Sequence, residues 1–165
     1  PGMNVADLGS APGSWTQIVR ERLTDKNGEL KGRIIAMDIL PMEPIDGVTF
    51  LQGDFREQEV ADKLNEILGG DKLDVVISDM APNLSGIAMV DANASLLLNE
   101  LALDFAVEHL KPEGVFVTKA FQGSGYSQFI ENCKKHFVSV AQRKPEASRN
   151  SSAEMYVVAR RLKQK

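Results

Sequence analysis

Charged side chains stand directly after short apolar runs in this sequence, and these are the residues whose types and spacing suit chemistry. Asp79 follows a run that ends at Ser78, and Lys119 ends the run 115–119. If these runs are adjacent parallel strands, both charges lie at one sheet edge within reach of each other, and Glu154 enters the last run from the same side. A lysine placed there can remove a proton from a hydroxyl group or aim its lone pair. An ion pair with a purely structural role is the alternative interpretation.

The expected roles of Asp79 and Lys119 differ. A lysine with an unperturbed pKa near ~10.4 is a poor base at neutral pH, although burial or a second ammonium group lowers that value. A close carboxylate acts in the opposite direction. We therefore expect Asp79 to hold Lys119 in position while contacting a ligand, and we leave open whether Lys119 acts as a base or only orients the hydroxyl.

A glycine loop and two further carboxylates predict a nucleoside site. The run Asn4–Leu8 leads into the loop Gly9–Trp15, and a helical pattern starts at once. Glycines there let a ligand approach the backbone, and the helix N-terminus offers free amide donors. Asp38 ends the second run and Asp54 follows the third. A carboxylate can accept hydrogen bonds from both ribose hydroxyls of an adenosine, and a second one can accept from the adenine amino group.

A dinucleotide such as NAD or FAD is the main alternative ligand. Its loop reads G-x-G-x-x-G, with an acidic residue ~20 positions further on. Here Gly9 and Gly13 read G-x-x-x-G, and Asp38 lies 29 residues past Gly9. This pattern favours S-adenosylmethionine, which carries no phosphate, although a plain structural turn is a third interpretation.

A parallel sheet would bring these residues together, and short β-rich runs alternating with longer helical patterns predict one. The expected strands are Asn4–Leu8, Arg33–Asp38, Val48–Gln52, Leu73–Ser78, Val115–Lys119, Val138–Gln142 and Met155–Ala159, and the expected helices are Ser14–Leu23, Gln58–Leu68, Ala92–Leu110 and Ser127–His136. A polar stretch without helical pattern joins the last two strands, which predicts a hairpin with one antiparallel strand. We therefore expect a single α/β domain over residues 1–165, Rossmann-like, with a seven-stranded, mostly parallel sheet and helices on both faces.

Six stretches resemble the FtsJ/RrmJ family of ribosomal RNA 2′-O-ribose methyltransferases, and the similarity covers essentially the whole chain. They are Asp7–Trp15, Asp38–Met42, Leu51–Arg56, Ser78–Asn83, Lys119–Gly123 and Arg143–Pro145. The resemblance implies an S-adenosylmethionine-dependent enzyme of the class I methyltransferase fold, whose substrate is the ribose 2′-hydroxyl of large-subunit ribosomal RNA.

The resemblance also implies roles for individual residues. The family's Lys-Asp-Lys-Glu catalytic tetrad matches this sequence at Asp79, Lys119 and Glu154, whereas its first lysine falls before Pro1, so we expect an N-terminally truncated chain. The implied cofactor-binding residues are Gly13, Trp15, Asp38, Asp54 and Asp79. Without the first lysine, a non-catalytic module that binds S-adenosylmethionine or RNA, or an inactive fragment, stays open as the alternative.

The charge of the chain is unevenly distributed. The net charge is −4 over 165 residues, but residues 134–165 hold nine Lys or Arg against two Glu, which leaves −11 on the rest. Arg143, Lys144 and Arg149 flank a serine-rich loop and are candidate contacts to RNA phosphates. A solvated basic tail is the alternative interpretation. The expected partner is large-subunit ribosomal RNA within a ribosomal particle, and we expect the protein to be a monomer.

The remaining features narrow the class of protein. Apolar residues make up 43% and charged residues 25% of the chain, as in ordinary folded domains. Cys133 is the single cysteine and no apolar run reaches the ~18 residues of a membrane span, so we expect a reducing, cytoplasmic setting and no membrane partner. His109 and His136 lack neighbours at metal-ligand spacing, so we expect no metal and interpret both as cations that cap helix C-termini.

Overall fold

The structure of this chain is a computed structural model of residues 1–165, and it describes residues 3–9, 14–30, 32–38, 44–45, 47–54, 57–79, 88–123, 125–144 and 154–163. Within helices and strands, the side chains at 14–17, 19, 88–95 and 154 lie outside the description. The elements follow the chain as β1 (Met3–Leu8), α1 (Ser14–Leu23), β2 (Gly32–Asp38), β3 (Val48–Gln52), α2 (Gln58–Leu68), β4 (Leu73–Ser78), α3 (Ala88–His109), β5 (Leu110–Phe121), α4 (Tyr126–His136), β6 (Phe137–Arg143) and β7 (Glu154–Leu162).

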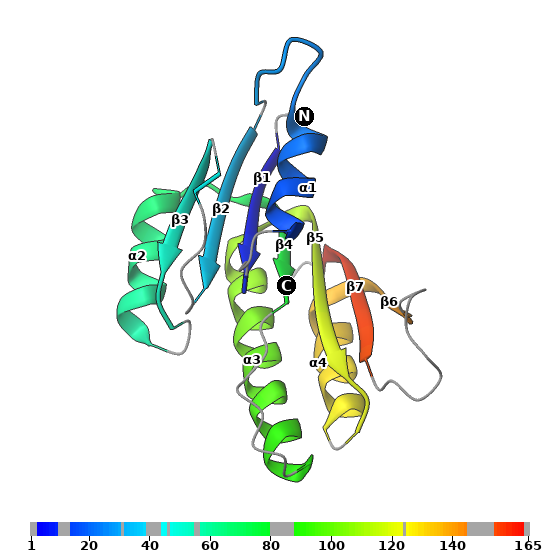
Figure 1. Ribbon diagram of the computed structural model, residues 1–165. Helices are drawn as coiled ribbons and strands as arrows, with labels where there is room; N and C mark the ends of the chain where they lie inside the picture. The colour runs from blue at the N-terminus through cyan, green and yellow to red at the C-terminus, as the bar shows by residue number, and fades with distance from the viewer. Residues whose placement is uncertain are drawn as a thin grey trace.

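The strands form a seven-stranded sheet in the order β3-β2-β1-β4-β5-β7-β6 (Figure 1). β1 to β5 pair in parallel, whereas β7 is antiparallel to both β5 and β6. The predicted fold class, including the single antiparallel strand and the terminal hairpin, is confirmed. The order in which strands are added to the sheet reverses between β1 and β4, and ligands of open α/β sheets bind at the carboxyl ends of the strands beside such a switch point.

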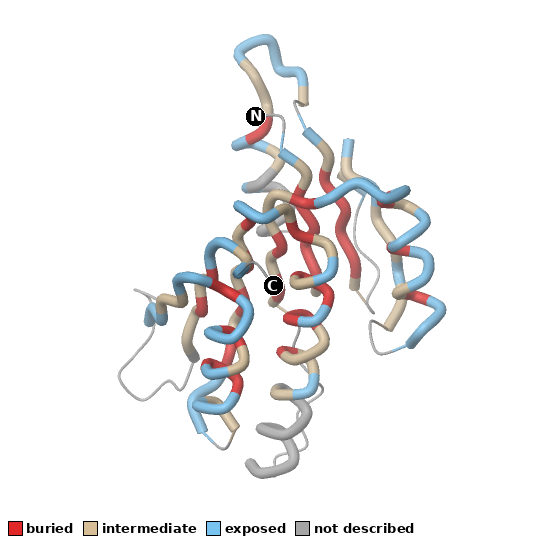
Figure 2. The backbone as a smooth tube through the Cα atoms, turned by 180° about the vertical axis from the view of Figure 1, so that it is seen from behind, coloured by how far each residue is buried: buried red, intermediate tan, exposed pale blue. Residues whose placement is uncertain are grey.

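Two apolar clusters hold the helices on the two faces of the sheet. On one face α2, α3 and α4 cover a large cluster, in which Phe116, Phe129 and Phe137 are almost completely buried. On the other face Leu23 of α1 packs with Val5 and Ile34 in a smaller cluster. Figure 2 shows the buried residues concentrated in the central strands and on the inward sides of the helices. Parallel strands need this cover on both faces, because their side chains point alternately to each.

Several elements are longer than predicted, and α3, β5 and β7 differ most; α3 begins at Ala88, not Ala92, and ends at His109, one residue before the predicted end. β5 begins at Leu110, not Val115, although Pro112 and Gly114 suggest a loop. Leu110 pairs with Leu73 and Val115 with Val75, and a register shift lies between these two pairs, so residues 111–114 are an irregular stretch of β5 held at both of its ends by β4. β7 continues to Leu162, past the expected end at Ala159. None of the helices within the described ranges is both long and apolar enough to cross a membrane.

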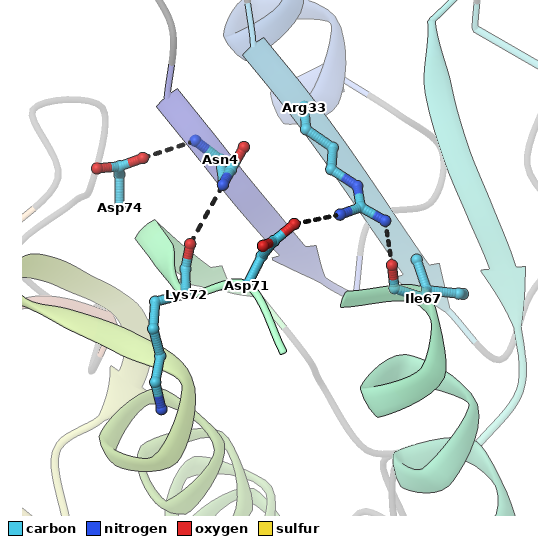
Figure 3. Close-up of polar contacts among 6 residues, drawn as sticks. All are labelled: Asn4, Arg33, Ile67, Asp71, Lys72 and Asp74. Atoms are coloured by element: carbon cyan, nitrogen blue, oxygen red, sulfur yellow. Dashed lines mark hydrogen bonds and ion pairs between the residues drawn. The ribbon is translucent and has the colours of Figure 1, made fainter. Parts of the chain in front are cut away.

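Polar contacts fasten the amino ends of the strands, at the edge opposite the carboxyl ends (Figure 3). The Asn4 backbone N–H donates to Asp74 Oδ2 at 2.7 Å, which ties the start of β1 to β4. The Arg33 guanidinium donates to the Ile67 carbonyl at the end of α2 and lies 3.5 Å from Asp71 Oδ2. The Lys111 ammonium meets Asp74 Oδ1 at 3.1 Å. These contacts fix the strands relative to one another and so set the alignment of their opposite ends.

The prediction that both histidines are capping cations is wrong for His109. His109 lies in the last turn of α3, where burial is the main cause that lowers its pKa, while Glu108 raises it and Lys72 lowers it further. Its ring contacts that of Phe105, with centroids 4.4 Å apart. His109 is therefore mainly a neutral packing residue near pH 7, whereas His136 is exposed in the last turn of α4.

The single cysteine is expected to resist thiol reagents while the protein is folded. Cys133 is completely buried in the larger apolar cluster, and burial raises the pKa of its thiol to about 12. Because the thiolate is the reactive form, iodoacetamide should label the native chain at least ~10²-fold more slowly than the chain in denaturant. Mass spectrometry over time measures both rates. Equal rates in the two states would show that Cys133 is accessible in the folded protein.

Candidate active site

Backbone hydrogen bonds hold the carboxyl ends of three strands, β1, β2 and β4, next to one another. Gly9, which follows β1, donates its N–H to the Met37 carbonyl of β2 at 2.7 Å. Asp79, which follows β4, donates its N–H to the Leu8 carbonyl of β1 at 3.0 Å. Gly9 has φ 77°, in the left-handed region that favours glycine, so the chain can turn sharply there. The residues that follow these strands therefore face one shared region, as the sequence predicted.

Asp79 and Lys119 form an ion pair in this region. The Lys119 Nζ lies 2.6 Å from Asp79 Oδ1, and the two side chains are 18% and 28% exposed. The sheet register explains the contact, because Ser78 of β4 pairs with Thr118 of β5, and Asp79 and Lys119 come directly after these two residues. The predicted juxtaposition of these residues is confirmed. Limited solvent access makes this pair stronger than an ion pair in open water.

The surroundings of Lys119 hold its side chain in one place. The ammonium lies 5.9 Å from the centroid of the Phe121 ring, within the range of a cation–π contact. Val115 and Val117 share the strand face of Lys119 by alternation, while Phe116, Thr118 and Ala120 are buried on the opposite face. Lys119 therefore stands on the face that carries α1, away from the larger apolar cluster.

Asp38 and Asp54 stand at the ends of the next two strands. Asp38 ends β2 in register with Gln52 of β3, and its carbonyl accepts the Gly53 N–H at 2.8 Å. A Cβ on Gly53 would lie 2.7 Å from Val60 Cγ2, so a side chain at position 53 would force Val60 of α2 to shift. Both carboxylates are partly exposed. A molecule that lies across the ends of these strands could therefore reach both residues from solvent.

The remaining predicted site residues are described only in part. Glu154 begins β7, where its backbone pairs with Phe121, two residues beyond Lys119. Trp15 lies in the first turn of α1, next to the glycine loop. The side chains of Glu154 and Trp15 are outside the description, and Gly13 and Arg149 lie outside the described residues. Arg143 and Lys144 are exposed at the end of β6, so the β6–β7 hairpin puts basic side chains at the same edge of the sheet.

Sequence reasoning missed buried polar residues, most of them on the sheet face opposite the ion pair. Ser78, Thr118 and Asn99 are buried, and the Thr118 hydroxyl donates to Asn99 Oδ1 of α3 at 3.4 Å. Asp7, one residue before the end of β1, is also completely buried. Asn99 lies in α3, whose sequence is mostly apolar, so its polar contact was not predicted. The only signal in the sequence was a polar residue inside each of several apolar runs.

The charges at this edge suit a cationic nucleoside. Among the described residues at the ends of β1 to β5, the carboxylates of Asp38, Asp54 and Asp79 outnumber the ammonium of Lys119. Carboxylates accept hydrogen bonds from hydroxyl and amino groups, and an excess of negative charge attracts a sulfonium ion and repels phosphate. The residues present therefore fit S-adenosylmethionine better than a dinucleotide.

Comparison with known proteins agrees with this geometry. The family model described as FtsJ-like methyltransferase matches residues 1–162. The chain is 55% identical to "Ribosomal RNA large subunit methyltransferase E" of Bordetella petrii over 96% of this chain and 75% of that protein. It is 52% identical to the protein of the same name from Cupriavidus necator, over 99% of this chain and 77% of that protein.

Solved structures show the same fold. A Plasmodium falciparum structure titled as a ribosomal RNA methyltransferase superposes with a TM-score of 0.81 at 30% identity, over 97% of this chain and 86% of that one. Human Methyltransferase-like protein 13, solved in complex with SAH, shares the fold at 17% identity with a TM-score of 0.63, over 97% of this chain and 72% of that one. The family match over nearly the whole sequence, together with the paired Asp79 and Lys119, shows that this chain belongs to the FtsJ-like methyltransferase family.

Proposed function

We propose that this chain transfers the methyl group of S-adenosylmethionine to the ribose 2′-hydroxyl of a nucleotide in large-subunit ribosomal RNA. The observation that carries the proposal is the 2.6 Å ion pair between Lys119 and Asp79, which lies at the same edge of the sheet as Asp38 and Asp54. The substrate class is supported by the name of the relatives, which are 52–55% identical to this chain. The cytoplasm, where ribosomal particles are available, is the proposed setting, and the proposed active form is a monomer.

The cofactor would lie across the ends of β1 to β4. Asp38 would accept hydrogen bonds from the ribose hydroxyls, and Asp54 from the adenine amino group. Asp38 ends β2 and Asp54 follows the neighbouring strand β3, so the two carboxylates would bind adjacent parts of one nucleoside. Asp79 would border the sulfonium end, where its charge attracts the cation. Gly13 and Trp15 complete the proposed contacts from the loop and the first turn of α1.

The chemistry requires a poor nucleophile to be aimed at a good electrophile. When bound, S-adenosylmethionine supplies an activated methyl group on a sulfonium ion. The ion pair with Asp79 favours the protonated form of Lys119, so its ammonium would donate a hydrogen bond to the 2′-oxygen and direct the remaining lone pair toward the methyl group. The hydroxyl proton would leave to solvent after attack. Glu154, at the start of β7, would complete the catalytic set from the neighbouring strand.

RNA would approach from the β6–β7 hairpin. Arg143 and Lys144 are exposed at the end of β6, and Arg149 follows in the same connection. These cations would bind phosphates and position the strand, while the 2′-hydroxyl itself distinguishes RNA from DNA. The hairpin pairs with β5 through β7, so it would deliver the RNA beside Lys119.

Calorimetry tests the cofactor assignment. Replacing Asp38 with alanine should weaken S-adenosylmethionine binding about 10- to 100-fold, because hydrogen bonds to a charged group contribute ~1.5–3 kcal/mol. Asp104→Ala, which removes an exposed carboxylate from α3, is the matched control and should leave binding unchanged. Titration of the wild-type chain with NAD should give no heat of binding. Binding of NAD in place of S-adenosylmethionine, or equal affinities of the Asp38 and Asp104 variants, would contradict the assignment.

A further inference from the structure

We propose that the end of the β6–β7 hairpin farthest from the active site is a second RNA-binding surface, which contacts the phosphate backbone several nucleotides away from the methylated one. We call it the far basic surface, and it consists of Lys134, Lys135, Arg160, Arg161 and Lys163. The inference rests on the proposed RNA substrate and adds a surface that the proposed chemistry does not use. It concerns the cations of residues 134–165, which we call the basic segment, that lie away from Arg143 and Lys144.

The β6–β7 pairing gathers these residues from two segments of the chain. Lys163 follows β7 and donates its backbone N–H to the His136 carbonyl at 2.8 Å, so it lies beside the last turn of α4, which holds Lys134 and Lys135. Arg160 pairs with Ser139 of β6 on one side and with Val115 of β5 on the other. All five basic side chains are exposed. The fold thus gathers the basic side chains of α4, of the end of β7 and of the residue after it around one end of the hairpin, with Arg160 on the sheet face opposite α4.

Nearby carboxylates neutralise this surface only in part. Glu131 lies 3.8 Å from Lys134, and both side chains are more than half exposed, so this pair is weak. Glu113 is an exposed acidic residue two positions before Val115, which pairs with Arg160. The five cations retain an excess of positive charge, in a chain whose residues 1–133 carry −11. A polyanion would therefore be steered to the hairpin and away from the acidic remainder.

Structural roles account for only part of the surface. Lys134 and Lys135 stabilise the C-terminal end of the α4 dipole. That explanation does not apply to Arg160 and Arg161 at the end of a strand. Arg161 also has φ 61°, the left-handed conformation that costs a residue with a side chain free energy, and among the described residues it is the only non-glycine with positive φ. An exposed arginine kept in a strained conformation is better explained by binding than by folding.

The distance between the two ends of the hairpin sets the length of RNA required. Lys119 pairs with Tyr156, and Lys163 lies seven residues further along, which corresponds to about 23 Å at ~3.3 Å per residue. A stacked strand advances ~3.4 Å per nucleotide, so about seven nucleotides separate the reacting ribose from the far basic surface. An RNA of about 5 nucleotides cannot bridge this distance, whereas one of about 20 nucleotides can.

The test compares RNA binding by a variant that loses three of these cations with binding by the wild type. The variant is Lys135→Gln, Arg161→Asn and Lys163→Gln, in which asparagine tolerates the left-handed backbone at position 161. The matched control is Arg22→Gln, Lys26→Gln and Lys63→Gln, which removes three exposed cations elsewhere, one of them also in the last turn of a helix. Fluorescence anisotropy of labelled RNA of about 20 and about 5 nucleotides is measured across a salt series.

We expect the surface variant to bind the longer RNA about tenfold more weakly and to lower the slope of log affinity against log salt by about 2. Its affinity for the short RNA, its affinity for S-adenosylmethionine and the control variant should match the wild type. A salt slope equal to that of the wild type would overturn the inference. So would a loss of binding to intact large-subunit particles but not to free RNA, because the surface would then contact a ribosomal protein.

A separate measurement, made on the wild-type chain, tests the proposed function. Methyl transfer by the wild-type chain to large-subunit ribosomal RNA tests that function and does not involve the surface variant. If the wild type transfers methyl groups and the surface variant binds long RNA equally well, only the far basic surface is disproved. If the wild type transfers none, the proposed function fails whatever the salt slopes are.

Discussion

Replacing Lys119 with alanine is expected to lower the rate of methyl transfer at least ~10³-fold while changing S-adenosylmethionine affinity less than about twofold. A factor of 10³ corresponds to about 4 kcal/mol in the barrier, a typical loss when a group that stabilises or orients the reacting oxygen is removed. The Lys119 ammonium lies between Asp79, at 2.6 Å, and the Phe121 ring, at 5.9 Å from its centroid. Single-turnover transfer of a labelled methyl group to ribosomal RNA measures the effect.

The same two strands provide a matched control for this variant. Lys111 lies near the start of β5 and pairs with Asp74 of β4 at 3.1 Å, so it repeats the lysine–aspartate pair at the opposite sheet edge. Lys111→Ala should cost less than ~1 kcal/mol of stability and leave transfer unchanged. If Lys119→Ala retains a rate within tenfold of the wild type, Lys119 is a structural residue. An inactive wild type that still binds S-adenosylmethionine would instead favour the non-catalytic module.

Replacing Asp79 with asparagine is expected to lower the rate about 10²-fold and to weaken cofactor binding, because one carboxylate serves both the lysine and the sulfonium end. Asparagine keeps the size of the side chain but cannot balance the Lys119 ammonium, which is only 18% exposed. Without the neighbouring negative charge the ammonium is less favoured, so the pKa of Lys119 should be lower in the variant than in the wild type.

The pH dependence of this variant distinguishes the two roles of Lys119. If the ammonium is the active form, activity is present below the lysine pKa and lost above it, so the alkaline limb of log kcat should move to lower pH in Asp79→Asn. If the neutral amine is a general base, activity rises through the lysine pKa, and the acid limb should move to lower pH instead. Our proposal requires the first result. A shift of the acid limb would assign Lys119 as the base.

Much of the fold and part of the site followed from the sequence. The sequence predicted that Asp79 lies beside Lys119, because residues at the carboxyl ends of adjacent parallel strands lie close together. The extension of β5 through Pro112 and Gly114 did not follow, because it depends on the pairing of Leu110 with β4 across a register shift, which these residues do not signal. The bond between Thr118 and Asn99 was equally invisible, because it depends on how α3 packs on β5 and not on either sequence pattern.

The left-handed conformation of Arg161 also had no sequence signal, because arginine rarely adopts it and asparagine or glycine would be the usual markers. The division of the basic segment into two surfaces depends on the hairpin register, which pairs Arg143 with Tyr156 and Ser139 with Arg160. Sequence alone could place nine cations in residues 134–165, but not on opposite ends of a strand pair.

The position of β7 determines when during synthesis this molecule can be completed. β6 pairs with β7 and not with β5, so in the described part of the chain it has no neighbouring strand when it leaves the ribosome. Until β7 has also emerged, β5 remains an open edge and Glu154 has not joined Phe121. A nascent chain that stops before β7 therefore carries Asp79 and Lys119 on an unfinished scaffold, and only a chain translated past Leu162 can acquire the full hairpin.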